Sequence, residues 1–349
     1  MTSLARYTTL GLGGPARRLV TAATDADLIA AVRAADGAGE PVLILGGGSN
    51  LVVADEGFPG TVIRVGTRGL RYGRDADGCT EVTVAAGEEW DDVVAATVVE
   101  GLAGLECLSG IPGRAGATPI QNVGAYGQEV AETITTVRVL DRRGGKIMDI
   151  PNERCGFAYR TSSFKRGPGR FVVLAVTFRL VRQALSRPVR YPDLAAELRV
   201  APGEQVTAAQ AREAVLKVRA RKGMVIDPAD PDTRSAGSFF MNPVLGAEEF
   251  AAVEAVAKER GLLPVPRFEA GGGLVKVPAA WLIERSGFGR GYSNGGAARV
   301  SSKHTLALVN PGGATTAQLL ALATEIRDGV RAAFGVGLEP EPVLVGVAL

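Results

Sequence analysis

The sequence predicts an α+β fold with more than one domain, and three observations support this prediction. The first half of the 349-residue chain alternates strand-like apolar runs with glycine-rich turns, and the turn at 141–145 (DRRGG) has the composition of a hairpin. The second half contains longer helical patterns. Between the halves, 187–203 carries three prolines without clear periodicity, and Pro228 and Pro231 follow. The length allows two or three domains.

Each element is predicted from its periodicity and its boundary residues. Thr24 with Asp27, and Thr207 with Gln210, have the spacing of capping boxes, and Gly101 follows a helical pattern as a stop signal. Helices are predicted over 24–35, 90–100, 207–221, 247–260, 279–286 and 316–334. Strands are predicted over 41–45, 51–53, 61–65, 81–86, 135–140, 146–150, 171–180 and 305–309, and at the end of 337–346.

Composition restricts the function classes. The 39 basic and 37 acidic residues leave a net charge of +2, so no basic surface for nucleic acid is predicted. The cysteines Cys79, Cys107 and Cys155 fit neither a disulfide framework nor a zinc site, which indicates reduced thiols in a cytoplasmic protein. The N-terminus lacks the apolar region of a signal peptide, and no window of about 18 uninterrupted apolar residues occurs, so neither export nor membrane spanning is expected.

The chain has a single histidine, His304, in the alternating segment 301–310. Histidine is the usual general base near neutral pH, so the chain either performs no such chemistry or obtains it from another group. We interpret His304 as a structural strand residue, and we expect no metal centre.

The segment 104–129 predicts neither a helix nor a strand, because five glycines between Gly110 and Gly127 and two prolines interrupt it. Its leucine, isoleucine and valine residues are too apolar for a solvated linker. The backbone N–H groups of such a loop still need partners, and a large planar ligand with a polar edge would supply them.

Three glycines precede Ser49 and Asn50 in the segment 46–50. A dinucleotide-binding fingerprint would open a helix, whereas strand-like residues follow here, and the GxGxxG spacing is absent. The glycines either form a concave row of N–H groups for a diphosphate or make a plain tight turn, and composition leaves both interpretations open.

Three further side chains are candidates for catalysis. Arg160, in 155–165, has the fork geometry that binds a carboxylate, although a surface ion pair is the commoner role. Ser238 lies between a glycine and two phenylalanines, outside a GxSxG pattern, so a core hydroxyl is its default interpretation. Glu341 lies between two prolines that would hold its carboxylate still, and a terminal surface acid is its alternative.

Together and in this order, the motifs resemble those of the UDP-N-acetylenolpyruvoylglucosamine reductases (UDP-N-acetylmuramate dehydrogenases), flavoenzymes of bacterial cell-wall precursor synthesis. The resemblance extends nearly from end to end of the chain. The motifs that carry it are GLGGPA, LGGGSN, GIPGRAGATPIQNVGAYGQE, FAYRTSSFK, RKGMV, AGSFFMNP, WLIERSGF and LEPE. The stretch that begins at Tyr191 (YPDL) further resembles the class that folds a tyrosine-bearing loop over the substrate.

The resemblance implies an FAD-binding fold of the p-cresol methylhydroxylase (PCMH) and vanillyl-alcohol-oxidase type, with two α+β subdomains and a third α+β domain for the substrate. The implied boundaries are 1–67 for FAD-binding subdomain 1, 68–221 for FAD-binding subdomain 2 and 222–335 for the substrate-binding domain. The C-terminal strand 336–349 is expected to join the active site.

The resemblance also implies the reaction, which is reduction of UDP-N-acetylglucosamine enolpyruvate to UDP-N-acetylmuramate for peptidoglycan synthesis, and so for cell shape and cell division. NADPH would reduce non-covalently bound FAD, and hydride would pass from flavin N5 to the enolpyruvyl methylene carbon. We expect these small molecules to be the partners of a cytoplasmic monomer that binds neither nucleic acid nor membrane.

The same resemblance implies the site residues. Arg160 would hold the substrate carboxylate, Arg160 and Glu341 would stabilise the enol intermediate, and Ser238 would deliver the proton. The implied FAD contacts are Gly46, Gly47, Gly48, Ser49, Asn50, Ile111, Pro112, Gly113, Gly116, Ala117, Gln121, Asn122, Gly124, Ala125 and Tyr126. The implied substrate contacts are Tyr159, Tyr191, Lys222, Asn242 and Arg285, with the lysine and Tyr191 near the phosphates.

Three residues depart from the common pattern of this family. Met241 stands where many relatives carry a polar residue, Arg285 where glutamine is usual, and Pro342 where valine is frequent. The first two concern substrate contacts, and Pro342 would shift Glu341. Two alternatives stay open: an FAD-dependent oxidase of an alcohol or sugar on the same fold, and a non-catalytic UDP-sugar-binding module.

Overall fold

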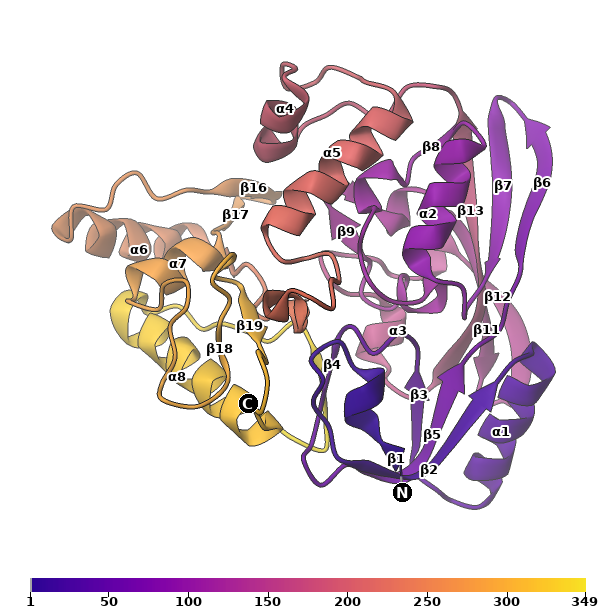
Figure 1. Cartoon of the computed structure of the whole chain (residues 1–349). Coiled ribbons are helices and arrows are strands. Elements are labelled where there is room, and N and C mark those ends of the chain that lie inside the picture. Colours follow the sequence, from indigo (N-terminus) through magenta and orange to yellow (C-terminus); the bar gives the residue numbers. More distant parts are fainter. Residues whose placement is uncertain (1) are drawn as a thin grey trace. The chain divides into compact units, whose positions relative to one another are not determined.

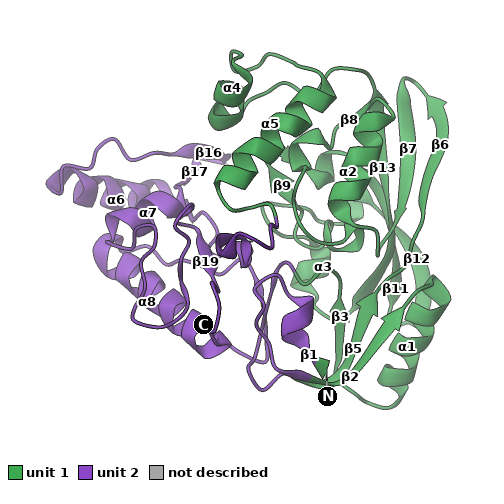
Figure 2. Ribbon diagram, viewed as in Figure 1, with its two compact units in different colours: residues 1–2, 16–48, 58–225 green, residues 3–15, 49–57, 226–349 purple. Residues whose placement is uncertain are grey.

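A computed structural model describes residues 2–349, which form two compact units (Figure 2). Unit 1 contains residue 2, Ala16–Gly48 and Phe58–Val225, and unit 2 contains Ser3–Pro15, Ser49–Gly57 and Ile226–Leu349. Both units mix helices and strands, so the predicted α+β class is confirmed. The three predicted domains and their boundaries stay predictions.

A four-stranded sheet has the order β1-β2-β5-β3 (Figure 1). Strand β1 is Thr2–Ser3, and the strands β2 (Pro15–Ala22), β5 (Phe58–Val65) and β3 (Val42–Leu45) pair in parallel. Helix α1 (Asp25–Gly37) connects β2 to β3. Its start is the predicted capping box: the Thr24 hydroxyl accepts from the Asp27 N–H, and Asp27 Oδ2 accepts from the Thr24 N–H, both at 3.1 Å.

The larger sheet of unit 1 is antiparallel, in the order β12-β11-β13-β7-β6, and β8 (Leu102–Ala103) also pairs with β13. Its strands are β6 (Leu70–Ala76), β7 (Cys79–Ala85), β11 (Ile134–Asp141), β12 (Lys146–Pro151) and β13 (Phe171–Arg182). Strands β11 and β12 pair from Thr136 with Pro151 to Asp141 with Lys146, which confirms the predicted hairpin.

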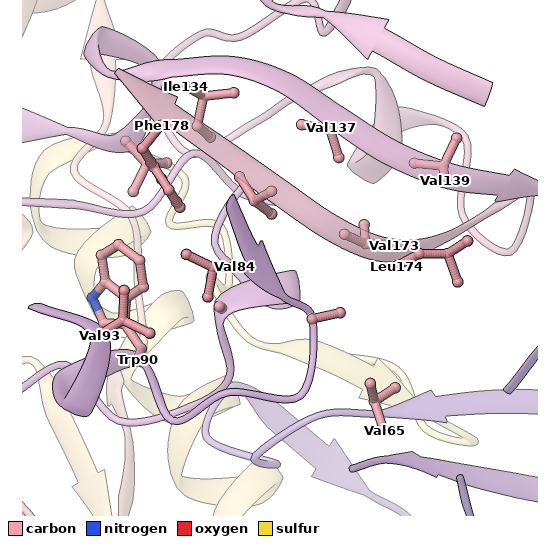
Figure 3. Close-up of a cluster of buried hydrophobic side chains, with 14 of the residues drawn as sticks. Val65, Val84, Trp90, Val93, Ile134, Val137, Val139, Val173, Leu174 and Phe178 are labelled. Atoms are coloured by element: carbon pink, nitrogen blue, oxygen red, sulfur yellow. The ribbon is translucent and has the colours of Figure 1, made fainter. Parts of the chain in front are cut away.

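Helix α2 (Trp90–Val99) packs its first residue into the core of unit 1. Figure 3 shows the Trp90 ring near Phe178 and Val84, and the Trp90 and Phe178 ring centroids are 5.7 Å apart. The indole Nε1 donates to the Leu108 carbonyl at 3.1 Å. The core of unit 1 therefore holds the first part of the glycine-rich segment by a hydrogen bond as well as by packing.

Three more helices belong to unit 1: α3 (Ser163–Arg166), α4 (Pro192–Leu198) and α5 (Ala208–Arg221). The capping box of Thr207 and Gln210 at α5 is confirmed. Helix α4 was not predicted, because seven residues span only about two turns and show no periodicity. Pro192 fits its first turn, and Arg199 ends it in a left-handed conformation.

Unit 2 contains helices α6 (Ala247–Glu259), α7 (Ala279–Arg285) and α8 (Thr316–Phe334), close to the predicted bounds. Its two three-stranded sheets have the orders β14-β19-β18 and β15-β17-β16. The strands are β14 (Ser235–Ser238), β15 (Val244–Leu245), β16 (Phe268–Gly271), β17 (Leu274–Lys276), β18 (Arg299–Val300) and β19 (Ala307–Val309). Strand β4 (Leu51–Val53) pairs in parallel with the C-terminal strand β20 (Val343–Val345).

The expectation that His304 is a strand residue was wrong. His304 lies in a turn that precedes β19, since the Ala307 N–H donates to the His304 carbonyl at 3.0 Å. The Ser301 hydroxyl accepts from the backbone N–H groups of Lys303 and His304 at 3.0 and 3.3 Å, which stabilises the turn. The alternation of apolar and polar residues in 301–310 therefore includes a turn, stabilised by Ser301, before the strand begins at Ala307.

Among residues 2–349, none of the helices combines the length and the apolar composition needed to cross a bilayer.

Candidate active site

The segment 104–129, here called the glycine-rich loop, contains no long helix or strand, as predicted. It has short 3-10 turns at Glu106–Leu108 and Ala115–Ala117 and a two-stranded pair, β9 (Gly124–Ala125) with β10 (Gln128–Glu129). A loop with so little regular structure needs other partners for its backbone N–H groups. Acidic side chains supply several of them.

Asp91, on α2, anchors the middle of the glycine-rich loop. Its Oδ1 accepts from the Gly110 N–H at 2.6 Å, and its carboxylate receives a two-pronged contact from Arg212 of α5 at 2.6 and 2.8 Å. Burial by itself raises the pKa of the Asp91 carboxyl, but the bonds from Arg212 and the Gly110 N–H outweigh it, so the pKa lies below its ordinary value. The anchor is therefore a charged carboxylate at neutral pH.

Glu106 is completely buried and joins the two ends of the loop. Its Oε2 accepts from the Gly104 N–H at 2.6 Å, and its Oε1 accepts from Gln128 Nε2 at 2.9 Å and from the Arg187 N–H at 2.7 Å. Three donors in three segments thus hold one carboxylate. Arg187 shortly precedes Tyr191 in the chain. The contact with Glu106 therefore connects the glycine-rich loop with the segment that contains Tyr191, the tyrosine predicted to fold over the substrate.

The predicted diphosphate-binding glycines approach the glycine-rich loop within unit 1. A Cβ added to Gly47 would lie 2.7 Å from the Gly113 Cα, a distance that backbone atoms cannot accommodate, so a side chain at this position would push the two loops apart. A Cβ on Gly46 would lie 3.5 Å from the Arg114 side chain and 4.0 Å from that of Ala117. The structure therefore brings together two segments that are more than 60 residues apart in the sequence.

Arg160 lies at the tip of a two-residue turn beside the same loop. Ala158 and Thr161 exchange both backbone hydrogen bonds, at 3.0 and 3.1 Å, and Arg160 between them has a left-handed backbone with φ of 53°. Its Nη2 donates to the Gly124 carbonyl at 2.7 Å, and its guanidinium lies 5.4 Å from the centre of the Tyr159 ring. A permanent cation is thereby fixed at the glycine-rich loop.

Two neighbouring side chains fasten this turn. Asn122 Nδ2 donates to the Ala158 carbonyl at 3.1 Å and to Glu129 Oε2 at 2.6 Å. The buried Ser162 hydroxyl donates to the Ile120 carbonyl at 2.5 Å. The two N–H groups of the Asn122 amide therefore both bond to protein oxygens.

A second group in unit 1 contains Tyr126, Tyr191 and Lys222. The Tyr126 and Tyr191 rings meet edge to face with centroids 5.2 Å apart, and Lys222 Nζ lies 6.0 Å from the Tyr191 ring centre and 2.6 Å from Asp193 Oδ2. Burial raises the pKa of the Tyr126 phenol, so this group stays protonated and can donate a hydrogen bond at neutral pH. Two predicted substrate contacts thus lie next to a residue of the glycine-rich loop.

In unit 2, backbone pairing brings Ser238 and Glu341 into neighbouring segments. The Glu341 N–H donates to the Phe239 carbonyl at 2.9 Å, and the Met241 N–H donates to the Glu339 carbonyl at 2.9 Å. Asn50 Nδ2 donates to the Glu341 carbonyl at 3.4 Å, and the Val343 N–H donates to the Asn50 carbonyl at 2.9 Å. Residues around 50, 239 and 341 therefore belong to one local arrangement.

The other two predicted substrate contacts also lie in unit 2. Asn242 Oδ1 accepts from the Ala279 N–H at 2.9 Å, which caps the start of α7. Arg285 is the last residue of α7, its side chain is exposed, and its carbonyl accepts from Arg260 at 2.6 Å. Asn242 and Arg285 therefore lie at opposite ends of α7.

Unit 1 contains 16 of the 20 cofactor- and substrate-contact residues predicted from the sequence, together with Arg160. Unit 2 contains Ser49, Asn50, Asn242 and Arg285, together with Ser238 and Glu341. The residues that unit 1 contains are Gly46, Gly47, Gly48, Ile111, Pro112, Gly113, Gly116, Ala117, Gln121, Asn122, Gly124, Ala125, Tyr126, Tyr159, Tyr191 and Lys222.

Sequence reasoning missed the acids that hold the loop, which are Asp91, Glu106 and Glu129. A signal for Glu106 was present, because a lone carboxylate among apolar loop residues must be buried with hydrogen-bond partners or point to solvent. No local signal existed for Asp91, whose partners lie in the loop and in α5. In the described part of the chain, no cluster of three or more histidine, cysteine or acidic side chains could hold a metal ion.

Comparison with known proteins matches both parts of the chain to described families. Residues 16–150 match the FAD binding domain, and residues 227–345 match the C-terminal domain of UDP-N-acetylenolpyruvoylglucosamine reductase. The chain is 57% identical to the UDP-N-acetylenolpyruvoylglucosamine reductase of Thermobifida fusca, over 99% of this chain and 97% of the relative. It is 58% identical to that of Streptomyces coelicolor, over 99% and 90%.

A solved structure is similar over nearly the whole length. The crystal structure of UDP-N-acetylenolpyruvylglucosamine reductase from Thermus caldophilus superposes with a TM-score of 0.66 at 27% identity, and the match covers 99% of this chain and 97% of that one.

The Asp91 anchor gives the loop a predictable pH dependence. Because its folded pKa is lowered, Asp91 contributes stability that is complete above the ordinary pKa and is lost as the pH falls through the folded pKa. We expect Asp91→Asn to lower the free energy of unfolding by about 1 kcal/mol at neutral pH, allowing for partial solvent screening, and by less near about pH 3. Urea unfolding followed by circular dichroism at both pH values measures the difference.

Asp92→Asn is the matched control for this experiment, since Asp92 is the exposed neighbour on the same helix. A difference between wild type and Asp91→Asn that stays constant or grows toward low pH would contradict the stabilising role of the charged carboxylate.

Proposed function

This chain belongs to the UDP-N-acetylenolpyruvoylglucosamine reductase family, and we propose how its own residues perform the reaction of that family. It is an FAD-dependent oxidoreductase that uses NADPH to reduce UDP-N-acetylglucosamine enolpyruvate to UDP-N-acetylmuramate. NADPH supplies a hydride for the methylene carbon and a proton is added to the adjacent carbon, leaving NADP⁺ and the saturated ether. The α+β fold combines an FAD binding domain with the C-terminal domain of this family.

The residues of the site fit FAD. The glycine-rich loop and Gly47 approach so closely that a side chain on Gly47 would collide with the backbone of Gly113, which is the construction expected where backbone must line a ligand. Bound FAD supplies the relay that accepts hydride from NADPH and donates it to the substrate. We propose that the sequence-predicted contacts from Gly46 to Asn50 and from Ile111 to Tyr126 hold this cofactor, except for Asn122, whose side-chain N–H groups both bond to protein oxygens.

The position of Arg160 is the observation that carries the catalytic proposal. Its guanidinium bonds to the Gly124 carbonyl of the loop, so a fixed cation lies at the segment that we propose holds the cofactor, and we propose that it binds the substrate carboxylate there. Negative charge develops on that carboxylate when the methylene carbon receives hydride. Arg160 would stabilise this enolate because its guanidinium is a cation whose donors are already oriented.

Ser238 and Glu341 are the other two residues that we propose as catalytic groups. The backbone bond between Glu341 and Phe239 keeps both residues in adjacent segments. We propose that the Ser238 hydroxyl delivers the proton to the carbon next to the carboxylate and that Glu341 stabilises the enol form. The remaining proposed contacts, Tyr159, Tyr191, Lys222, Asn242 and Arg285, would orient the UDP-sugar, with Lys222 and Tyr191 near the phosphates.

We further propose that the enzyme works as a monomer in the cytoplasm, without nucleic-acid or membrane partners, in support of cell shape and division. The nearly balanced charge supports the first exclusion. The cellular location follows from the two nucleotide substrates, since NADPH and UDP-sugars are both available there.

Anaerobic spectroscopy tests the proposed reaction directly. Purified protein should show a flavin absorbance band that NADPH bleaches and that one equivalent of UDP-N-acetylglucosamine enolpyruvate restores. Restoration by oxygen but not by this substrate would indicate the oxidase alternative. A colourless protein that takes up no FAD would support the non-catalytic module.

The proton-donor role of Ser238 predicts a selective defect in Ser238→Ala. FAD content and reduction by NADPH should stay within about twofold of wild type, whereas reoxidation by the substrate should slow by roughly 10² to 10⁴, the usual contribution of a positioned acid. Stopped-flow absorbance separates the two steps. Ser286→Ala is the control, because the Ser286 hydroxyl only bonds to the Leu282 carbonyl within its own helix. Wild-type reoxidation in Ser238→Ala would disprove the role.

The close approach of Gly47 to Gly113 predicts that Gly47→Ala weakens FAD binding about tenfold or more, since the added methyl group must displace backbone. Titration of the FAD-free protein with FAD, followed by flavin fluorescence, measures the dissociation constant. Gly37→Ala is the matched control, because no atom lies within 4 Å of a Cβ placed there. Equal FAD affinity in the two variants would refute the proposed role of this glycine.

A further inference from the structure

The segment around Arg160 combines unusual backbone geometry with unusually complete side-chain anchoring. Five non-glycine residues in the described chain have a left-handed backbone, and three of them, Asn122, Tyr126 and Arg160, belong to the glycine-rich loop or its neighbouring turn. A left-handed conformation costs most residues about 1 to 2 kcal/mol, and asparagine tolerates it better than arginine does. Arg160 therefore keeps this conformation only because its surroundings impose it.

Contacts from both sides impose the conformation. On one side, Asn122 Nδ2 donates to the carbonyl of Ala158, the residue that opens the turn. On the other side, Ser162, which follows the turn, donates to the Ile120 carbonyl. The Lys165 ammonium donates to the Arg160 carbonyl at 3.1 Å. The turn is thus fastened at its start, at its strained residue and at its end.

Asn122 is the anchor best placed to control this turn. It is 1% exposed, and its side chain makes three hydrogen bonds: Nδ2 donates to Ala158 and to Glu129, and Oδ1 accepts from the Ala131 N–H at 3.1 Å. Both amide hydrogens are directed at protein oxygens. The Asn122 side chain therefore has no N–H group left to donate to a cofactor, although the resemblance of its motif implies a cofactor contact.

The same anchor controls the other bond of Arg160. Glu129, which Asn122 holds, pairs with Gly124 across β9 and β10, and Gly124 offers the carbonyl that receives Arg160 Nη2. A Cβ on Gly124 would lie 2.8 Å from Glu129 Cγ and 3.0 Å from Arg160 Nη1. Asn122 therefore fixes both the backbone of the turn and the strand that receives the guanidinium.

We propose that Asn122 is a positioning residue that sets the location of the Arg160 guanidinium, and that it acts on the substrate half of the reaction rather than through contact with the cofactor. This inference rests on the proposed function, in which Arg160 holds the substrate carboxylate. A displacement of about 1 Å at a positioned catalytic group can cost about 10²-fold in rate. Loss of the amide releases the turn and gives the guanidinium freedom of that order.

Two variants test the proposal. Asn122→Gly removes the amide and keeps a residue that adopts the left-handed backbone without strain. Asn122→Asp keeps the size and the bond from Ala131, but it places a second acceptor against the Ala158 carbonyl and the Glu129 carboxylate. In both, substrate-driven reoxidation should slow by roughly 10 to 100-fold. FAD content and the rate of reduction by NADPH should stay within about twofold of wild type.

Asn152→Asp is the matched control. Asn152 also donates two hydrogen bonds from Nδ2, to the Ala131 and Ile134 carbonyls, both at 2.8 Å, and neither partner belongs to the 158–161 turn. Its reoxidation rate should stay within about twofold of wild type. An equal loss of reoxidation in this control would overturn the proposal, because any buried asparagine would then have the same effect.

Two readouts separate positioning from general loss of structure. Hydrogen–deuterium exchange should accelerate in the peptide that covers 158–161 and not in β11 or β13. In an Arg160→Lys background, Asn122→Gly should slow reoxidation by less than about twofold further, because a residue that acts through Arg160 has nothing left to position.

Other outcomes would overturn the inference. These are wild-type reoxidation in both Asn122 variants, equal loss of both half-reactions, loss of FAD in both variants, or full additivity with Arg160→Lys. A wild-type enzyme that the enolpyruvyl substrate fails to reoxidise would instead refute the proposed function, whatever the variants do.

Discussion

The hydrogen bond from Arg160 to the Gly124 carbonyl is the contact on which the proposed chemistry depends, because it fixes a positive charge beside the glycine-rich loop. Arg160 makes this bond from a left-handed backbone conformation, which a residue with a long side chain seldom adopts by itself. The surrounding segments compensate with an amide, a hydroxyl and an ammonium group. In this part of unit 1, the side chains of Asn122, Ser162 and Lys165 together stabilise one strained turn.

Carboxylates have a structural role in this site that is separate from any catalytic one. A loop rich in glycine and poor in regular structure leaves many N–H groups without helix or strand partners. Asp91, Glu106 and Glu129 accept hydrogen bonds from the loop or its neighbours, and each does so from within or beside the apolar core. These short acceptors hold the loop without bulky side chains that would occupy the space of a ligand.

Local signals in the sequence predicted much of the fold. The capping boxes at Thr24 and Thr207 and the β11–β12 hairpin were confirmed, since the interactions that create them lie within a few residues. Helix α4 and strand β6 were missed, because one is too short to show a period and the other is mostly exposed. His304 was predicted to lie in a strand because apolar and polar residues alternate around it, but a turn stabilised by Ser301 interrupts the strand there.

The sequence by itself determined the chemistry that this chain can carry. Long motifs identified its family, and the types of residue within them, namely an arginine, a serine, a glutamate and two groups of glycines, indicated flavin-dependent reduction without a histidine base. Only the tertiary structure decided which of these residues contact one another. It brought Gly47 against Gly113, placed Arg160 on the loop, and directed the amide of Asn122 at the Ala158 carbonyl of the Arg160 turn. The physical reason is that motifs record residue types in order along the chain, whereas a hydrogen bond depends on distance and direction in space, and partners in the candidate site are up to 291 residues apart.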